Sequence, residues 1–366
     1  MPFVTRLEPD ALVRDFLAHP PDGFSAQRTA DGMPAFTAPF DVLTTADPEL
    51  LRRIQGWPGQ RIWRRWLTLR TRFVGATNTE YLWLPPTEPA TLARRLREHE
   101  GIHCALLIVK DVPTDSPLLT DAANAQAGAF AQACENEGFV LLEGQALAWV
   151  PIDFASTDDY LSRLSRSRRR NLRRKLRSRE GLEVETLATG AAAFADEAVV
   201  DAFYALYLSV YAQSELHFDR LSRAYFHTLL NDADSGGVVF VYREQGRMIG
   251  WNLCYVFDGR LVDKYIGLAY PQALEHSLYT VSWFENLDYA RHHGLSAYIA
   301  GWTDPQAKRA LGAQFTFTRH AVYARNPLLR ALLRRLAPWF ESDRSVLAES
   351  TEPTSTQAES DDADRS

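Results

Sequence analysis

A run of arginines near the middle of the chain constrains the fold more than any other feature of the sequence. Between Arg163 and Arg179, ten of the seventeen residues are Arg or Lys and none is acidic, although the 366-residue chain has a formal net charge of -6. Leucines recur through this run at helical spacing, at positions 161, 164, 172 and 176. Such spacing aligns them on one stripe of a helix. The pattern predicts a folded helix with a narrow buried seam and an arginine-rich face, rather than a disordered basic tail.

Arg168 interrupts this leucine stripe, because it lies four residues from both Leu164 and Leu172. We therefore expect its guanidinium to point toward the core side of the helix. A buried guanidinium needs a partner, which would be either an internal carboxylate or an anionic ligand such as a phosphate. Arg168 and its neighbour Arg169 are thus candidate substrate-binding residues. The other arginines form either a solvated face or a surface for a polyanion or anionic lipid headgroups.

The acidic charge of the chain is concentrated at its C-terminal end. Residues 341–366 contain eight acidic and two basic residues, which account for the whole net charge of -6. A segment so poor in apolar residues cannot bury enough surface to fold, so we predict a disordered acidic tail. The remaining length suits two domains, which we assign to residues 1–150 and 151–340.

The three cysteines and the hydropathy of the chain exclude some classes of protein. Cys104, Cys134 and Cys254 are widely spaced and form no metal-binding pattern, so we expect reduced thiols and no metal. No segment approaches the roughly 18 apolar residues of a membrane-spanning helix. These features predict a cytoplasmic protein. Residues 326–340 read as a short basic amphipathic helix, which either docks on the protein or makes peripheral contact with the inner face of the membrane.

Hydrophobic periodicity and turn signals predict a mixed α+β fold. The second half shows three consecutive strands, then a helix, a strand, a short helix and a last strand. The first half mixes helices and strands less regularly. The strands are expected at 81–84, 105–110, 139–142, 147–150, 238–242, 248–256, 261–266, 297–300 and 315–324, and the helices at 47–54, 89–100, 122–137, 195–213, 221–230, 276–293 and 305–311.

The order of these elements resembles the GNAT acyltransferase fold, and more narrowly its Fem-like branch. The segments that carry the resemblance are the Arg-rich helix, Val241–Asn252, Asp263–Gly267 and Gly301–Ala313, in which a lysine precedes a Gly-Ala pair by a few residues. The resemblance implies two tandem GNAT-like domains, each with a mostly antiparallel twisted sheet flanked by helices. It also implies transfer of an acyl or aminoacyl group from acyl-CoA or aminoacyl-tRNA to an amine. The acceptor would be a small molecule or a cell-envelope precursor.

One segment departs from the pattern of ordinary GNAT enzymes. Those enzymes hold the pyrophosphate of coenzyme A with a glycine-rich turn at a helix N-terminus. The equivalent residues here, Tyr270–Ser277, include no glycine. We therefore do not expect this loop to grip a pyrophosphate closely, although acyl-CoA stays a candidate donor.

The resemblance singles out Lys308 as a catalytic candidate, which would stabilise either the oxyanion or the donor phosphates. Asp304, just before Pro305, is a natural helix N-cap or else a substrate-binding group. His276 is either a general base or a structural histidine.

Charged and aromatic residues of the three consecutive strands complete the candidate site. Side chains of a strand alternate between its faces, so either Lys264 or the Asp263 and Tyr265 pair should face the cleft. The cleft is expected where strand 261–266 diverges from strand 297–300. Three further residues would either line a substrate groove or fill the core: Trp251, Asn252 and Trp302.

Two other functions compete with acyl transfer. The helix from Arg163 to Arg179 is also compatible with a module that binds nucleic acid or an anionic membrane surface. A catalytically silent tandem of domains is the third possibility.

Overall fold

The computed structural model describes residues 3–41, 68–102, 104–214, 218–337 and 347, with the side chains of Asp41 and Leu336 left aside. The helix expected at 47–54 lies outside the described residues, as does the acidic tail apart from Leu347. Eleven described strands form one sheet in the order β1-β2-β3-β4-β11-β5-β10-β9-β8-β7-β6. The strands are β1 (Ser25–Arg28), β2 (Pro34–Asp41), β3 (Thr68–Val74), β4 (Leu106–Thr114), β5 (Val140–Pro151), β6 (Glu183–Ala188), β7 (Gly237–Glu244), β8 (Arg247–Phe257), β9 (Arg260–Leu268), β10 (Ala297–Gly301) and β11 (Gln314–Ala324).

The sheet is mostly antiparallel, with two parallel pairs at corresponding places in its two parts. Among the described strands, only β3 with β4 and β9 with β10 run parallel. The last strand, β11, crosses to the first part of the chain and inserts between β4 and β5. Because β5 also pairs with β10, the two parts share a continuous hydrogen-bonded sheet. The expected mixed α+β class with a mostly antiparallel sheet is confirmed, and the division at residue 150 stays a prediction.

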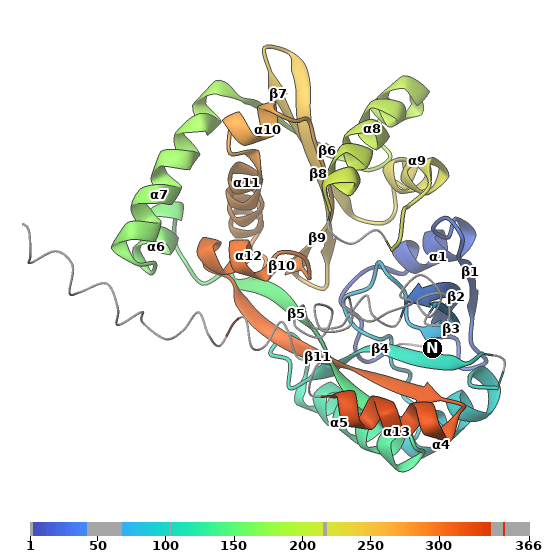
Figure 1. Cartoon of the computed structure of the whole chain (residues 1–366). Helices are drawn as coiled ribbons and strands as arrows, with labels where there is room; N and C mark the ends of the chain where they lie inside the picture. The colour runs from blue at the N-terminus through green and yellow to red at the C-terminus, as the bar shows by residue number, and fades with distance from the viewer. Residues whose placement is uncertain (1–2, 42–67, 103, 215–217, 338–346, 348–366) are drawn as a thin grey trace, which may run out of the picture.

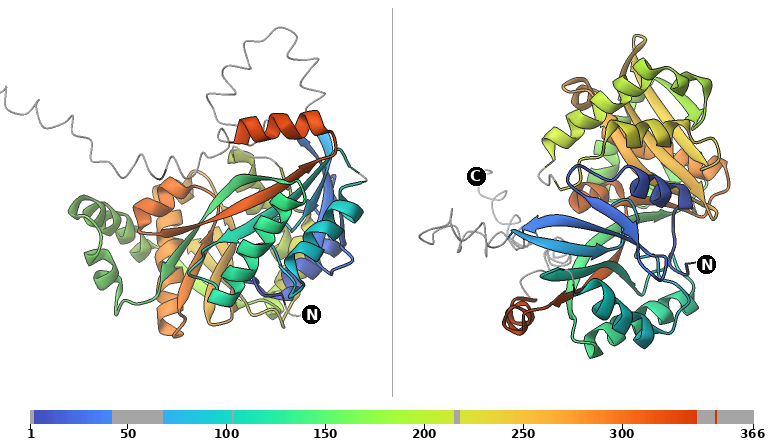
Figure 2. Two further views of the ribbon diagram at one scale, coloured as in Figure 1. Left: turned by 90° about the horizontal axis from the view of Figure 1, so that it is seen from below. Right: turned by 90° about the vertical axis from the view of Figure 1, so that its right-hand side faces the viewer.

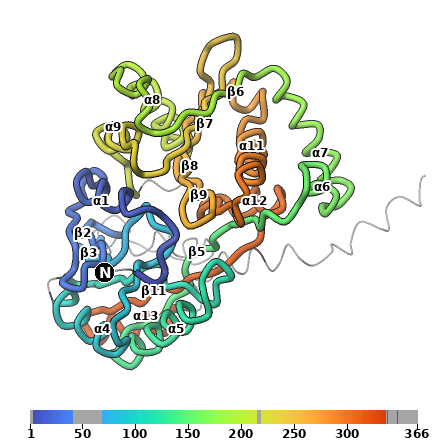
Figure 3. Tube along the Cα trace, turned by 180° about the vertical axis from the view of Figure 1, so that it is seen from behind, coloured from blue at the N-terminus to red at the C-terminus, as the bar shows by residue number. Residues whose placement is uncertain are grey.

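Helices cover both faces of this sheet (Figures 1 and 2). In the part formed by β6–β9, α8 and α9 lie on one face and α10 and α11 on the other, with α7 outside α11 (Figure 3). In the other part, α4 and α5 cover one face, and α13 lies on the opposite face. The helices are α1 (Asp10–Ala18), α4 (Pro89–Arg95), α5 (Asp121–Asn136), α6 (Thr157–Ser162), α7 (Arg166–Leu176), α8 (Glu197–Gln213), α9 (Arg223–Asn231), α10 (Gln272–Glu275), α11 (Leu278–His292), α12 (Pro305–Leu311) and α13 (Pro327–Leu336), with short π or 3-10 turns at Leu96–Glu100, Arg177–Gly181 and Ala192–Ala195.

The arginine-rich run folds as two helices rather than as one. The hydroxyl of Ser165 accepts a hydrogen bond from the Arg168 N–H and begins α7 as its N-cap, after α6 has ended at Ser162. The break changes the helical phase, so the stripe counted through Leu164 and Leu172 does not continue through Arg168. The expectation that Arg168 points to the core is therefore wrong, and its side chain is exposed.

Two other expectations are corrected in detail. Residues 81–84 are buried but form no ladder, because Leu82 N–H donates to the Asp111 carbonyl and Leu84 N–H donates to the Thr5 hydroxyl. The strands expected at 139–142 and 147–150 are one long strand, β5.

The basic helix expected after residue 326 is α13, which buries Leu333 and leaves Leu328 exposed.

Gly267 in β9 tests the packing of the core that supports this sheet. A Cβ atom at this position would lie 2.2 Å from Nε1 of Trp251, whose indole stacks on Phe203 and donates to the Phe203 carbonyl. Gly267→Ala should therefore lower the free energy of unfolding by about 1–3 kcal/mol, as overpacking does. Urea denaturation measures this change. Gly181→Ala is the matched control, because a Cβ atom there meets no atom within 4 Å, and equal stability of the two variants would contradict the packing.

Candidate active site

A cavity opens where β9 and β10 stop pairing. Their parallel ladder covers only Arg260–Val262 and Ala297–Ile299, after which β10 ends and the chain turns into α12. The cavity has a volume of about 250 Å³. Its lining comes from five segments: Thr77–Glu80, Asp219, Asp263–Ile266, the α11 residues Tyr279, Ser282 and Trp283, and the last group Tyr298, Ala300–Thr303 and Lys308. The site thus combines both parts of the chain.

A β-bulge turns three consecutive residues of β9 toward this cavity. Leu253 pairs with Tyr265 and Cys254 pairs with Asp263, which leaves Lys264 as the extra residue. Strict alternation would have sent Lys264 to the face opposite its neighbours. The bulge removes that alternation, so Asp263, Lys264 and Tyr265 all line the cavity. The expectation that only one of the two sets faces the cleft is wrong for this reason.

Lys308 enters the cavity from the short helix α12. The carboxylate of Asp304 caps this helix and accepts a hydrogen bond from Ala307 N–H at 3.1 Å, and Pro305 occupies its first turn. Lys308 is only 3% exposed, and its amine lies beside Gly301, where a Cβ atom would be 3.9 Å from Nζ. Within the described parts of the chain, no side chain forms a hydrogen bond or an ion pair with this amine. Burial lowers the pKa of Lys308 to about 8, and the charge of Asp263 opposes that shift.

Asp263 holds the opposite charge in the same cavity. Its Oδ2 accepts hydrogen bonds from the Tyr298 hydroxyl at 2.7 Å and from Asn286 Nδ2 at 3.2 Å. Burial raises the pKa of Asp263 to about 6, and the Tyr298 hydrogen bond and Lys308 oppose this effect. Asp263 and Lys308 therefore bear titratable groups whose pKa values lie on the two sides of neutrality, as in sites that transfer protons.

Asn252 lies behind this carboxylate instead of lining the cavity. Its Nδ2 donates to Asn286 Oδ1 at 3.0 Å, and its Oδ1 accepts from the Tyr242 hydroxyl at 2.7 Å. Asn252 thus orients Asn286, which in turn contacts Asp263. Trp251, the preceding residue, points to the opposite face of the sheet and fills the core.

Glu8 and Glu80 are charged residues near the site that sequence reasoning missed. Glu80 lines the cavity and forms an ion pair with Lys264, and both side chains are at most 5% exposed. Glu8 lies behind Glu80 and accepts hydrogen bonds from Trp83 Nε1 at 2.7 Å and from Glu80 N–H at 3.4 Å. Burial raises the pKa of Glu8 to about 7, and Lys264 opposes that shift. Both glutamates belong to segments without helix or strand periodicity, so no sequence pattern points to them.

The remaining sequence-predicted residues divide between the cavity and other places. Trp302 and Tyr265 line the cavity, and the Tyr265 hydroxyl is 2.9 Å from that of Tyr225. His276 instead contacts Glu244 on the β7–β8 hairpin, at 2.8 Å. Neither arginine lines the cavity: Arg168 Nη1 donates to the Arg309 carbonyl at 3.5 Å, and Arg169 Nη1 donates to the Ser162 carbonyl at 3.3 Å.

Two classes of feature are absent from the described part of the chain. It holds no cluster of three or more His, Cys, Asp or Glu residues that is arranged to bind a metal ion. It also holds no helix of the length and hydropathy needed to cross a membrane.

Comparison with known proteins identifies the family of this chain. Residues 119–358 match the model of the FemAB-like family, described as peptidoglycan biosynthesis/recognition, so the chain belongs to that family. The predicted Fem-like relationship is thereby confirmed, and the family supports a transferase. No curated protein matches the sequence.

Solved structures share the fold over nearly the whole chain at low sequence identity. The C-terminal domain of a putative lysylphosphatidylglycerol synthetase from Agrobacterium fabrum is 14% identical, with 92% of this chain and 91% of that one covered and a TM-score of 0.50. L-PGS from Bacillus licheniformis is 11% identical, with 91% and 98% covered and a TM-score of 0.50. FemX is 13% identical, with 90% and 99% covered and a TM-score of 0.50. These similarities show a common fold.

The buried ion pair between Lys264 and Glu80 generates a stability prediction. Lys264→Met leaves the Glu80 carboxylate buried without its cation, so we expect a loss of about 3–5 kcal/mol in the free energy of unfolding. The double variant Lys264→Met/Glu80→Gln removes both charges and should recover a large part of that loss. Chemical denaturation of the two single variants and the double variant gives the coupling energy. Additive losses would show that the two charges do not interact.

Proposed function

We propose that this protein is an N-acyltransferase that moves an acyl or aminoacyl group from an activated donor to a primary amine. The observation that carries the proposal is the buried amine of Lys308, which faces Asp263 across a cavity at the divergence of β9 and β10. The family relationship supports a transferase, and the cavity supplies the groups that acyl transfer needs. The acceptor would be a small molecule or a cell-envelope precursor, and an acceptor of the second kind would be met in the cytoplasm at the inner face of the membrane.

Lys308 would stabilise the transition state. When the acceptor amine attacks the carbonyl carbon of the donor, the carbonyl oxygen becomes an oxyanion. With a pKa lowered to about 8, Lys308 is mainly an ammonium group at neutral pH and can donate a hydrogen bond to that oxygen. In the buried cavity such an interaction is stronger than in water. Lys308 therefore acts as the electrophilic group of the proposed reaction.

Asp263 would accept the proton that the attacking amine must lose. When the oxyanion collapses, the bond between the carbonyl carbon and the donor's thiol sulfur or ribose oxygen breaks, and Asp263 would return the proton to that leaving group. With a pKa raised to about 6, its carboxylate is ionised at neutral pH and still basic enough for proton transfer. Tyr298 and Asn286 hold this carboxylate in one orientation. Burial keeps the pKa of Tyr265 well above its usual value, so Tyr265 would position the substrate as a neutral hydroxyl.

The size of the cavity limits which part of the donor enters it. A volume of about 250 Å³ accommodates an acyl or aminoacyl group beside an amine, but it is smaller than pockets that enclose whole drug-sized ligands. The nucleotide portion of acyl-CoA or aminoacyl-tRNA would therefore lie outside. In the segment before α11, the N–H groups of Ala273, Leu274 and His276 donate to carbonyls of the same segment. This pattern disfavours a close grip on a pyrophosphate and favours aminoacyl-tRNA over acyl-CoA as the donor.

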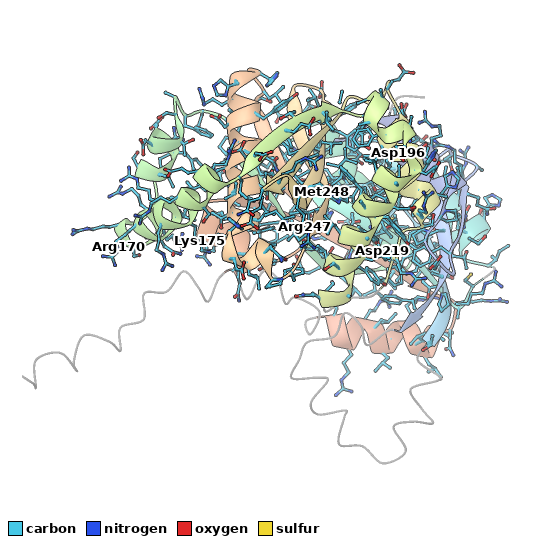
Figure 4. The ribbon with its side chains drawn as sticks, turned by 90° about the horizontal axis from the view of Figure 1, so that it is seen from above. Arg170, Lys175, Asp196, Asp219, Arg247 and Met248 are labelled. Carbon is cyan, nitrogen blue, oxygen red and sulfur yellow. The ribbon has the colours of Figure 1, made fainter. Side chains whose placement is uncertain are left out.

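The exposed arginines of α7 favour a second, compatible function, the binding of a polyanion. Arg170 projects away from the body of the protein (Figure 4), and the helix sequence contains no acidic residue. Some of its arginines have carboxylate partners, as Arg173 does in Asp158, whereas the hydrogen bond of Arg174 goes to the Asn171 amide oxygen. The Arg168 contact with Arg309 links α7 to α12, which carries Lys308. An RNA backbone on α7 would thus approach the rim of the cavity.

Substitution of Lys308 tests the proposed mechanism. Lys308→Ala should lower kcat/KM by about a hundredfold or more, because it removes the ammonium group that donates a hydrogen bond to the oxyanion. The assay is amine acylation with a panel of acyl-CoA and aminoacyl-tRNA donors, at matched thermal stability of the variants. Equal rates would remove Lys308 from the mechanism, and an inactive wild type across the panel would contradict the proposed activity.

The pH dependence of the rate distinguishes two roles for Lys308. If its ammonium form is the active one, kcat/KM should fall as the pH rises through about 8, the pKa of this group. Lys308→Arg carries a guanidinium that stays charged, so its residual activity should lack that fall. A wild-type rate that instead increases through the same range would identify the neutral amine as a proton acceptor.

Charge reversal on α7 tests the polyanion surface. The double variant Arg170→Glu/Arg174→Glu should bind a bulk tRNA mixture more weakly than wild type and show a smaller dependence on salt. Arg325→Glu makes the same type of change at an exposed position near α13 and serves as the control. Filter binding over a salt series gives both quantities. Retained RNA binding together with lost binding to phosphatidylglycerol vesicles would assign α7 to a membrane surface instead.

A further inference from the structure

One carboxylate oxygen in the cavity lacks a partner. Oε1 of Glu80 pairs with Lys264 Nζ, whereas Oε2 is buried and accepts no hydrogen bond from the described residues. Leaving an ionised oxygen buried and unsatisfied costs free energy, because the group loses its hydration without replacement. Glu80 lines the cavity. A ligand that brings hydrogen-bond donors would remove this cost.

A second unsatisfied acceptor comes from the same segment. Asn78 uses its Nδ2 group twice, as donor to the Leu12 carbonyl at 2.6 Å and to the Tyr225 hydroxyl at 2.8 Å. These two hydrogen bonds fix the orientation of the amide, so its Oδ1 atom points away from Leu12 and Tyr225. Oδ1 is buried and has no partner among the described residues, and Asn78 also lines the cavity. The segment 77–80 therefore contains two hydrogen-bond acceptors, Asn78 Oδ1 and Glu80 Oε2, that have no donor among the described residues.

The charges around the cavity favour a cationic ligand. Its lining contains the carboxylates of Glu80, Asp219 and Asp263, against the amines of Lys264 and Lys308. Asp219, which follows α8 (Figure 4), is half-buried, and desolvation raises the pKa of its carboxyl group. With all five lining groups charged, the cavity carries one excess negative charge that a monovalent cation would neutralise.

We propose that the Asn78–Glu80 end of the cavity is a subsite for a primary ammonium group of the substrate. An ammonium group has three donors and no acceptor, which fits the unsatisfied oxygens of Glu80 and Asn78. Lys264 holds Glu80 in place through one oxygen and leaves the other for the ligand. This inference rests on the proposed acyl transfer and adds to it the requirement that one substrate carry a positively charged ammonium group.

Two sources supply this chemistry in an acyl-transfer reaction. One is the α-ammonium group of an aminoacyl donor, which would distinguish aminoacyl groups from simple acyl groups. The other is an ammonium group on the acceptor. In both cases Glu80, in the first part of the chain, selects the substrate, and the reaction takes place at Asp263 of β9 and Lys308 of α12.

Binding of n-butylamine tests the subsite without any need for turnover. Isothermal titration at about pH 6, where a primary amine is fully charged, compares n-butylamine with n-butanol, which has a similar size and no charge. Wild type should bind n-butylamine in clear preference to n-butanol. Glu80→Gln should weaken n-butylamine binding by about tenfold or more, the usual effect of losing a hydrogen bond to a charged group.

Glu8→Gln is the matched control for this measurement. It makes the same change in the same cluster, but Glu8 does not line the cavity. Because the pKa of Glu8 is raised to about 7, this residue is mainly protonated at about pH 6, so the substitution changes little charge there. Glu8→Gln should therefore bind n-butylamine nearly as wild type does. Should Glu80→Gln fail to fold, the neutral pair Lys264→Met/Glu80→Gln is measured in its place, with the same expected loss.

The outcomes separate this inference from the proposed function. Equal binding of n-butylamine and n-butanol, or unchanged n-butylamine binding by the Glu80 variant, would overturn the subsite even if acyl transfer is observed. Preferential amine binding without turnover would support the subsite and contradict the transferase. Where turnover is observed, a Glu80→Gln effect on the KM of an aminoacyl donor that disappears after N-acetylation of the donor assigns the subsite to the donor. An effect on the acceptor KM alone assigns it to the acceptor.

Discussion

The buried ion pair between Lys264 and Glu80 joins the two parts of the chain at the cavity, and the geometry of the site depends on it. Lys264 belongs to β9, whereas Glu80 belongs to an irregular segment that follows β3. Burial of two charges is costly, and one without the other would be costlier still. The pair therefore restricts how the two parts of the sheet meet. It also explains the need for the bulge in β9, because only a bulged Lys264 can face Glu80 while Asp263 faces Lys308.

The same low-polarity surroundings give Asp263 and Lys308 their chemical character. Burial is the largest cause of both pKa shifts, and it acts in opposite directions on an acid and on a base. Without the charge of the other group, the pKa of each would be shifted further from its usual value. The pKa values of the two groups, about 6 and about 8, thus stay close to neutral pH. At that pH the Asp263 carboxylate can accept a proton and the Lys308 ammonium group can donate a hydrogen bond. A hydrogen-bonded chain through Asn286 and Asn252 fixes the carboxylate from behind, so its orientation is set before any substrate binds.

The sequence predicted most of the elements of the second part but not the details that create the site. The periodicity of β7, β8 and β9 and the capping signals of α12 are strong because they are local. The bulge at Lys264 depends on the pairing of β9 with β8, which no local pattern encodes. The break at Ser165 was missed for a related reason: a serine within an arginine-rich run reads as an ordinary helix residue until its hydroxyl is seen to cap α7. Glu8 and Glu80 come from segments without periodicity, and only tertiary contacts bring them to the cavity.

The path of β11 explains how the first part of the chain influences a site whose titratable pair lies in the second. Helix α12 holds Lys308 and is followed after two residues by β11, which is fixed between β4 and β5. The start of β11 pairs with the end of β5, and β5 pairs on its other edge with β10, the strand that leads into α12. Both ends of α12 are therefore anchored to β5. Because β5 is a long strand that belongs to both parts of the sheet, the position of Lys308 is determined by the first part of the chain as much as by the second.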